Sequence, residues 1–150
     1  MSRVHVAALS LSAAALVGIA VHEGYRDTAY LPTPQDVPSI GFGTTQGVKL
    51  GDKITPERAL VRLLGDAGKF EQAVKQCADV PLFQHEFDAY VSLTYNIGSG
   101  AFCSSTLVRK LKAGDYAGAC LEILRWDKQA GRVLPGLTKR RQQEYAQCVG

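Results

Sequence analysis

The chain opens on a long apolar run. Residues 4–21, "VHVAALSLSAAALVGIAV", would extend about 27 Å as a helix, which is close to the hydrocarbon thickness of a bilayer. Alanine, serine and glycine dilute the run, so such a helix would be held weakly in a membrane. A cleaved signal peptide is an alternative, although no convincing A-x-A site follows. A buried core helix is disfavoured because no polar face interrupts the run.

Two further regions with different patterns of apolar and polar residues follow this run. Residues 31–52 hold three prolines and four glycines among short β-favouring pieces, which predicts a small β-hairpin region over about 30–53. Thr55 as N-cap and Pro56 at the first helical position then begin a predicted helix. Further helices are predicted after Pro81, over two short stretches broken at 113–115, and over 137–149. The sum is an α+β domain with little sheet and a helical body.

The composition limits the classes of ligand that the protein is expected to bind. Seventeen Lys and Arg residues against fourteen Asp and Glu give a net charge of +3, too small to imply nucleic acid but suited to an anionic polymer such as a cell wall. The four cysteines show no CxxC spacing and the three histidines are scattered, so we expect no metal site. Disulfide bonds in an oxidising compartment are the better interpretation of the cysteines.

Glu23 directly follows the apolar run and is the first candidate for chemistry. Cleavage of a glycosidic bond needs a proton donor on one side of the sugar and a carboxylate or an oriented water on the other. Partial burial between the helix end and Tyr25 would favour the protonated form of Glu23 near neutral pH. From "HEG" alone, however, a glutamate that merely ends a helix in solvent is the favoured interpretation.

The residues after Glu23 favour the catalytic interpretation of this glutamate. "EGYRDTAY", a turn and then "SIGFGTT" closely resemble the T4-type phage lysozymes of glycoside hydrolase family 24, in which E-G-x-R-x-x-A-Y precedes a hairpin and T-I-G-x-G-x-T. The resemblance continues in "FDAYVSLTYNIGSGAF", "STLVRKLKAGDYAGAC", "RW" and "LPGLTKRRQQEY". Together with the weak N-terminal helix, the chain is most similar to the signal-anchor-release endolysins of phages or prophages.

This resemblance implies a lysozyme-like fold and a specific route through the cell. Residues 1–21 would be a signal-anchor-release helix and residues 22–150 a muramidase domain. Export would use the Sec pathway, with a tether in the inner membrane and later release to the host periplasm. The implied reaction is hydrolysis of the β-1,4 bond between N-acetylmuramic acid and N-acetylglucosamine in peptidoglycan, by a monomer without a cofactor.

Other functions stay open at this point. A wall-binding or lysis-regulating protein with an impaired site is one, and a lytic transglycosylase is another. A membrane-resident pore-former is a third, against which the large cysteine-bearing domain argues.

Carried over by position, the resemblance makes Glu23 the general acid and places Ser39 where the family has a threonine that helps to hold the attacking water. Serine keeps a hydroxyl that can donate and accept. The family's second acid falls on Pro32, and the only acid between residues 30 and 39 is Asp36. Asp36 could replace the missing acid or could be a turn residue. Asp27 is a weaker candidate, because on a continuing helix it would share a face with Glu23.

Other positions receive supporting roles from the resemblance. Arg26 and Tyr30 match positions that support the glutamate and the hairpin. Tyr95 and Asn96 match positions along the substrate cleft, although Tyr95 could equally belong to the core and Asn96 could cap a helix. Trp126 is expected to anchor the helical core. The basic run 139–141 would face either an anionic wall or solvent.

The resemblance also implies a cysteine pairing. Cys120 would join Cys148, because their helices pack together in the family, and Cys77 would then join Cys103. Each bond would close a loop worth about 3 to 4 kcal/mol in the chain-entropy model. Neither bond involves the segment around Glu23, so latency before release would rest on the membrane tether.

Overall fold

The computed structural model describes all residues 1–150, which form two compact units. One unit combines Met1–Ala15 with Phe70–Gly150, and we call it the helical unit. The other comprises Leu16–Lys69, and we call it the hairpin unit. The helices α1 (Ala13–Glu23) and α2 (Pro56–Cys77) each run from one unit into the other.

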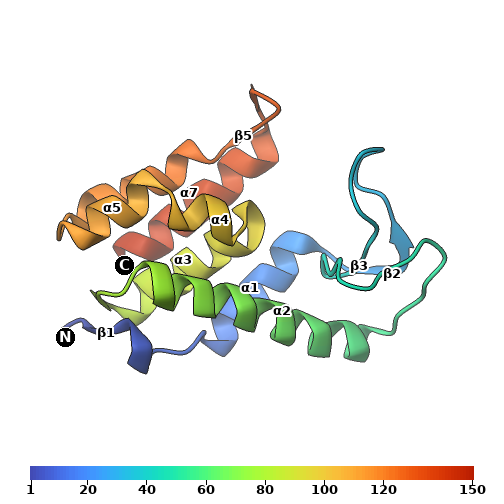
Figure 1. The fold of residues 1–150 in the computed structure, drawn as a ribbon, viewed down its shortest axis with the longest axis horizontal. Helices are drawn as coiled ribbons and strands as arrows, with labels where there is room; N and C mark the ends of the chain where they lie inside the picture. Colours follow the sequence, from blue (N-terminus) through green and yellow to red (C-terminus); the bar gives the residue numbers. More distant parts are fainter. The chain divides into compact units, whose positions relative to one another are not determined.

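The helical unit confirms the helices predicted for the second half of the chain (Figure 1). α3 ends before Gly98, and α3 and α7 pack along each other around buried Phe87, Tyr90 and Leu93. The two small strand pairs of this unit, β1 with β4 and β5 with β6, were not predicted. The elements are β1 (Val4–His5), η1 (Val6–Ala8), β4 (Pro81–Leu82), α3 (Gln84–Ile97), α4 (Ser99–Cys103), α5 (Thr106–Lys112), α6 (Tyr116–Glu122), η2 (Ile123–Arg125), β5 (Lys128–Gln129), β6 (Arg132–Val133) and α7 (Pro135–Val149).

Both disulfide bonds lie in the helical unit and join the predicted pairs. Cys77 at the end of α2 is bonded to Cys103 at the end of α4, with their Cα atoms 5.2 Å apart. Cys120 in α6 is bonded to Cys148 in α7, with their Cα atoms 5.7 Å apart. Each bond joins two separate helices and closes a loop that restricts the unfolded chain.

The basic run 139–141 lies largely inside the protein, so both predicted surface roles are wrong for two of its three residues. Arg140 is 6 % exposed and Arg141 is fully buried. Their guanidinium groups form ion pairs with Glu144 at 3.1 and 2.8 Å, and the hydroxyl of Ser92 donates to the same carboxylate at 2.7 Å. A helical spacing of three and four residues places these charges on one face of α7.

The apolar run 4–21 is not one helix in this structure. The helix α1 begins only at Ala13, because Ser12 acts as its N-cap: the Ser12 hydroxyl accepts from the Ala15 N–H at 3.1 Å and donates to Asp88 at 2.7 Å. Before the cap, β1 pairs with β4 and the side chain of Val6 is fully buried. None of the helices combines the length and the apolar character that a bilayer crossing requires.

Arg3 fastens the start of this segment to the helical unit. Its guanidinium donates through Nε and Nη2 to the buried carboxylate of Glu86, with distances down to 2.8 Å. The same group lies over the rings of Tyr116 and Phe83, 3.7 and 4.4 Å from their centroids. Hydrogen bonding to Glu86 raises the pKa of Arg3. The predicted boundary at residue 21 therefore stays a prediction about a tethered form.

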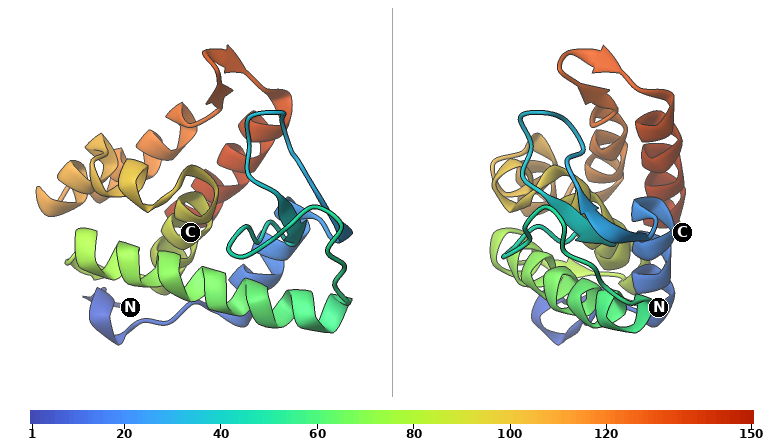
Figure 2. Two further views of the ribbon diagram at one scale, coloured as in Figure 1. Left: turned by 45° about the vertical axis from the view of Figure 1, so that its right-hand side comes forward. Right: turned by 90° about the vertical axis from the view of Figure 1, so that its right-hand side faces the viewer.

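The hairpin unit contains β2 (Arg26–Tyr30) and β3 (Ser39–Gly41), which pair antiparallel with Arg26 opposite Gly41 and Tyr30 opposite Ser39 (Figure 2). The hairpin thus starts four residues earlier than predicted. Its small core consists of Ala29, Ile40 and Val48, with Ile54 packed against them. Thr55 caps α2 as predicted, since its hydroxyl accepts from the Arg58 N–H at 3.4 Å.

Candidate active site

The position of Glu23 follows from how α1 ends. Gly24 adopts a φ of +70°, and its N–H donates to the Ala20 carbonyl at 3.0 Å. This left-handed residue is the ordinary helix C-terminus that glycine favours. Because β2 starts at Arg26, the chain turns at once from helix to strand and leaves Glu23, half-buried, at the junction. Asp27 accordingly lies on a strand, and the continuing helix that was considered for it is wrong.

The Glu23 carboxylate lies against the backbone of Gly43. A β-carbon at residue 43 would lie 3.1 Å from Glu23 Oε2, and Gly43 has a φ of +86°. Both observations make glycine the residue that fits, since a larger residue would be strained and would press on the carboxylate. The "GFG" of the sequence therefore provides the close approach of the β3 turn to the acid.

Ser39 is placed at the other end of β3. It is 6 % exposed and lies opposite Tyr30 in the hairpin register. Its hydroxyl makes no hydrogen bond to another protein group, so both its donor and its acceptor capacity are available for a ligand or water. The strand thus carries Ser39 at one end and leads into the turn against Glu23 at the other.

A hydrogen bond to α2 holds that turn, and it was not predicted from the sequence. Ile40 and Thr44 exchange backbone hydrogen bonds of 2.9 and 3.0 Å, which closes the turn around Gly43. The Thr44 hydroxyl then donates to Asp66 on α2 at 2.6 Å, and Thr44 is 2 % exposed. The only signal in the sequence was a threonine directly after the glycine turn, and its distant partner could not be inferred from spacing.

Asp36 lies in the loop at the closed end of the hairpin. Its N–H donates to the Thr33 carbonyl at 3.0 Å, and its carboxylate accepts from the Thr33 hydroxyl at 2.9 Å. These are the bonds of a turn residue, and the side chain is exposed. Pro32, at the family's acid position, lies in the same loop. The geometry thus favours the turn role, and a catalytic role for Asp36 stays a prediction.

Arg26 and Tyr30 contact each other along β2. The Arg26 guanidinium lies 4.7 Å from the centroid of the Tyr30 ring, a cation–π distance. Tyr25 adds a contact that was not predicted: its hydroxyl donates to the Ile54 carbonyl at 2.7 Å, and its ring lies 5.6 Å from that of Phe42. These contacts tie β2 to the segments after β3. The predicted support of Glu23 by Arg26 and Tyr30 stays a prediction.

The remaining predicted positions belong to the helical unit. Tyr95 is half-buried at the end of α3 with its ring 5.1 Å from that of Phe70, and Asn96 is exposed beside it. Their predicted role in binding substrate stays a prediction. Trp126 is half-buried and lines a surface hollow with Ser105 and Glu122, and its expected role as a core anchor stays a prediction.

The hairpin unit therefore presents the Glu23 carboxyl group at the end of α1 and the Ser39 hydroxyl group at the start of β3. A half-buried carboxyl group can donate a proton, and a free hydroxyl can orient water. No group of three His, Cys, Asp or Glu side chains gathers as metal ligands. The arrangement is suited to acid-assisted hydrolysis.

Comparisons with known proteins agree with this chemistry. The family model for phage lysozyme matches residues 20–144. An endolysin of Acyrthosiphon pisum secondary endosymbiont phage 1 is 40 % identical over 142 residues, covering 92 % of this chain and 97 % of the relative. A SAR-endolysin of Pseudomonas phage phiKMV is 37 % identical over 141 residues, covering 91 % and 87 % of the two chains.

Solved structures give the same result. The endolysin of Escherichia coli O157:H7 phage FAHEc1 superimposes with a TM-score of 0.83 at 37 % identity, covering 95 % of this chain and 94 % of that one. The muramidase domain of SpmX from Asticaccaulis excentricus superimposes with a TM-score of 0.87 at 31 % identity, covering 94 % and 98 %.

Proposed function

The chain belongs to the phage lysozyme family, and from this premise we propose that Glu23 is its general acid. The protein is an endolysin, a muramidase-type hydrolase that degrades bacterial peptidoglycan. The bond that we propose for cleavage is the β-1,4 bond between N-acetylmuramic acid and N-acetylglucosamine. The observation that carries the proposal is the Glu23 carboxyl group, half-buried at the end of α1 and packed against Gly43.

In the proposed reaction, Glu23 protonates the glycosidic oxygen as the bond to the leaving sugar breaks. Positive charge then develops on the sugar ring, and water attacks from the opposite face. The proton that this water loses passes to solvent, from which Glu23 is protonated again. The Ser39 hydroxyl orients this water, because it is buried and makes no hydrogen bond within the protein. Asp36 would act as the base only if the hairpin loop moved its carboxylate out of the turn with Thr33. Tyr95 and Asn96 would bind the glycan strand.

Replacement of Glu23 by Gln tests the acid role. The amide keeps the shape but cannot donate the proton as a carboxyl group does, so release of reducing ends from purified sacculi should fall at least 1,000-fold, beyond the ~100-fold lower bound typical of general acid catalysis. Glu57→Gln, an exposed glutamate in the first turn of α2, is the matched control and should retain activity. Substantial activity of Glu23→Gln with an unchanged unfolding midpoint would remove the assignment.

Product analysis separates the alternatives. Mass spectrometry of the digest should find ordinary reducing ends, whereas 1,6-anhydro ends would identify a lytic transglycosylase. Binding of the unaltered protein to sacculi without any cleavage would identify a wall-binding protein instead. A wall-binding protein is an alternative because Pro32 stands where the family has its second acid.

The cellular route is also a proposal, supported by the SAR-endolysins among the relatives. We propose export by the Sec pathway, a tether to the inner membrane through residues 1–21, release to the periplasm and action as a monomer. Fractionation of cells that express the full Glu23→Gln chain should find it first with the inner membrane and later in the periplasm. A chain that stays in the cytoplasm throughout would contradict the route, and sedimentation of the released form would test the monomer.

A further inference from the structure

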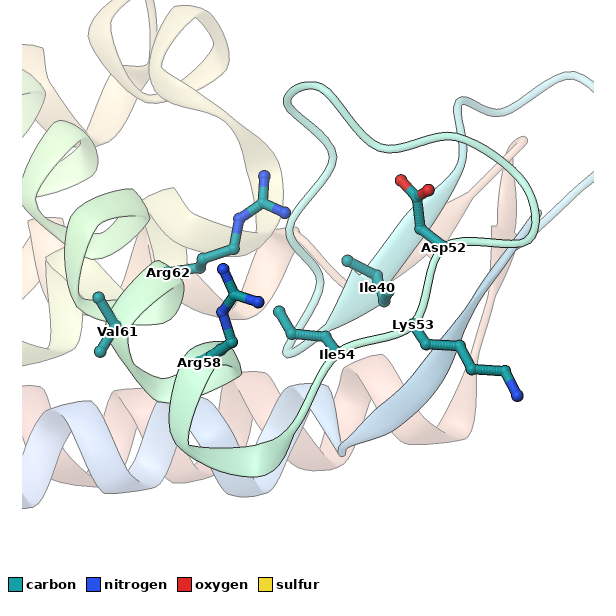
Figure 3. A pocket seen from close by; sticks show the side chains of 7 residues that line it. All are labelled: Ile40, Asp52, Lys53, Ile54, Arg58, Val61 and Arg62. Carbon is teal, nitrogen blue, oxygen red and sulfur yellow. The ribbon is translucent and has the colours of Figure 1, made fainter.

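The hairpin unit contains a hollow that is lined by none of the residues assigned to the reaction. It has a volume of about 540 Å³ and lies between β3, residues 52–54 and the first two turns of α2 (Figure 3). Ile40, Ile54 and Val61 give it apolar walls, and the side chains of Arg58 and Arg62 extend into the same space. It therefore combines an apolar surface with two guanidinium groups.

The hollow and the Ser39 side chain lie on opposite faces of β3. Successive side chains of a strand point to opposite faces, so Ile40 faces away from its neighbour Ser39. Ile40 lines the hollow, while Ser39 is the residue proposed to orient water. A ligand in the hollow would thus not compete with a sugar at Ser39.

The two arginines have an arrangement that is unfavourable without a ligand. Four residues apart on α2, they place like charges on one face of the helix, and Arg58 also puts a cation in the first turn, against the helix dipole. Elsewhere on the same helix the charges are paired: Lys75 with Glu71 at 3.0 Å and Lys69 with Asp66 at 3.8 Å.

No carboxylate of the hairpin unit neutralises this pair. The Arg58 guanidinium has no hydrogen bond or ion pair, and Arg62 donates only to the Gln46 carbonyl. Asp52 lines the hollow, but its carboxylate accepts from the Lys49 N–H at 2.9 Å. The Lys53 side chain points away from both guanidiniums (Figure 3). An anion from another molecule would therefore complete the charge balance of the hollow.

We propose that this hollow binds a short peptide that carries free carboxylates and small aliphatic side chains, the chemistry of peptidoglycan stem peptides. A guanidinium binds a planar carboxylate through two parallel hydrogen bonds, which favours carboxylates over isolated point charges. The walls of Ile40, Ile54 and Val61 suit methyl and methylene groups. The choice of peptide rests on the proposed function, since the same polymer carries both the glycan and the stem.

The test measures binding to a chain that cannot hydrolyse the wall. A synthetic stem tetrapeptide, L-Ala-γ-D-Glu-meso-diaminopimelate-D-Ala, is titrated by calorimetry into the full-length Glu23→Gln protein. Saturable binding is expected, and the added pair Arg58→Gln and Arg62→Gln should weaken it at least tenfold. The matched control, Lys128→Gln with Arg132→Gln, removes the same charge from exposed positions of β5 and β6 and should change binding less than twofold.

Each other outcome overturns the proposal. Equal weakening by the control pair would show that only net charge matters. Unchanged peptide affinity in the Arg58 and Arg62 variant would exclude the site. If that variant bound the peptide normally but no longer bound phosphatidylglycerol vesicles, the hollow would be assigned to a membrane surface. Near-ultraviolet circular dichroism checks that the variant folds. Because the assay needs no hydrolysis, failure of the proposed function appears separately, in the activity of the unaltered chain on sacculi.

Discussion

The helical unit contains both disulfide bonds and a buried cluster of charges, whereas the hairpin unit has neither. The hairpin unit is ordered by glycine conformations at residues 24 and 43, by the hydrogen bond from Thr44 to Asp66, and by a core of a few aliphatic side chains. The proposed acid is in this second unit. The disulfide bonds and the buried ion pairs thus lie in one part of the chain and the proposed acid in the other.

This difference implies that stability and activity respond to different substitutions. Changes in the helical unit, apart from Tyr95 and Asn96, should lower the free energy of unfolding while folded molecules keep their specific activity. Changes at Gly43, which lies against the Glu23 carboxylate, should reduce activity by more than they reduce stability. The predictions below test this separation, from the largest expected effect to the smallest.

Glu144→Gln should give the largest loss of stability. The substitution removes the negative charge that compensates two buried guanidiniums, those of Arg140 and Arg141. Breaking a buried ion pair from one side typically costs about 3 to 5 kcal/mol. Urea unfolding followed by circular dichroism measures the change. Glu122→Gln is the control: its partners Lys110 and Arg125 are 34 % and 71 % exposed, so water can solvate them and the loss should stay below about 1 kcal/mol.

Removal of one disulfide should have the next largest effect. Replacing Cys120 and Cys148 by Ala frees a loop with a sequence separation of 28, which the chain-entropy model equates with about 3 to 4 kcal/mol. Thermal unfolding measures the loss. At a temperature where the variant is still folded, its rate of wall hydrolysis should match the parent. A rate that fell in proportion to stability would contradict the separation of the two units.

The sequence carried different amounts of information about the two units. Helices α2, α3, α5, α6 and α7 were predictable because capping residues, helical spacing and glycine stops act locally. The buried pair of Arg140 and Arg141 was not, because a basic run gives no sign of a glutamate that compensates it inside the fold. The disulfide pairing was available only from family resemblance, since four cysteines allow three pairings.

In the candidate site, too, local features were predictable from the sequence and contacts between distant residues were not. Glu23 followed from a motif, and Gly24 explains by local geometry why the helix stops there. The contact of Gly43 with the Glu23 carboxylate joins residues that are twenty positions apart, and the bond from Thr44 to Asp66 spans a similar distance. The late start of α1 at Ala13 depends on the distant Asp88, which receives the Ser12 hydroxyl bond. Contacts with residues distant in the sequence therefore decide structure that the local sequence pattern does not predict.

Gly43→Ala should separate activity from stability within the hairpin unit. The added methyl group would lie 3.1 Å from Glu23 Oε2, so the acid must move and sacculus hydrolysis should fall roughly 10- to 100-fold, as small misplacements of a catalytic group do. Backbone strain at the φ of +86° should cost about 1 to 2 kcal/mol.

Gly47→Ala is the matched control for this substitution. Its φ of +72° brings the same strain, but nothing lies within 4 Å of the added β-carbon. It should lose similar stability and keep its activity. Equal activity losses in the two variants would show that strain, and not the contact with Glu23, governs the site.

Thr44→Val should have the smallest effect and tests whether the turn needs its anchor. Valine keeps the shape but removes the hydroxyl that donates to Asp66 at 2.6 Å, so the Asp66 carboxylate loses a buried partner and the unfolding free energy should fall by about 1 to 2 kcal/mol. Because the turn also carries Gly43, activity should fall by a few-fold at most, since the backbone bonds between Ile40 and Thr44 remain. Thr28→Val is the control, since its hydroxyl bonds only to the neighbouring exposed Asp27. If Thr44→Val and Thr28→Val unfolded at the same urea concentration, the bond to α2 would not be what orders the turn, and its order would have to come from the glycine conformations alone.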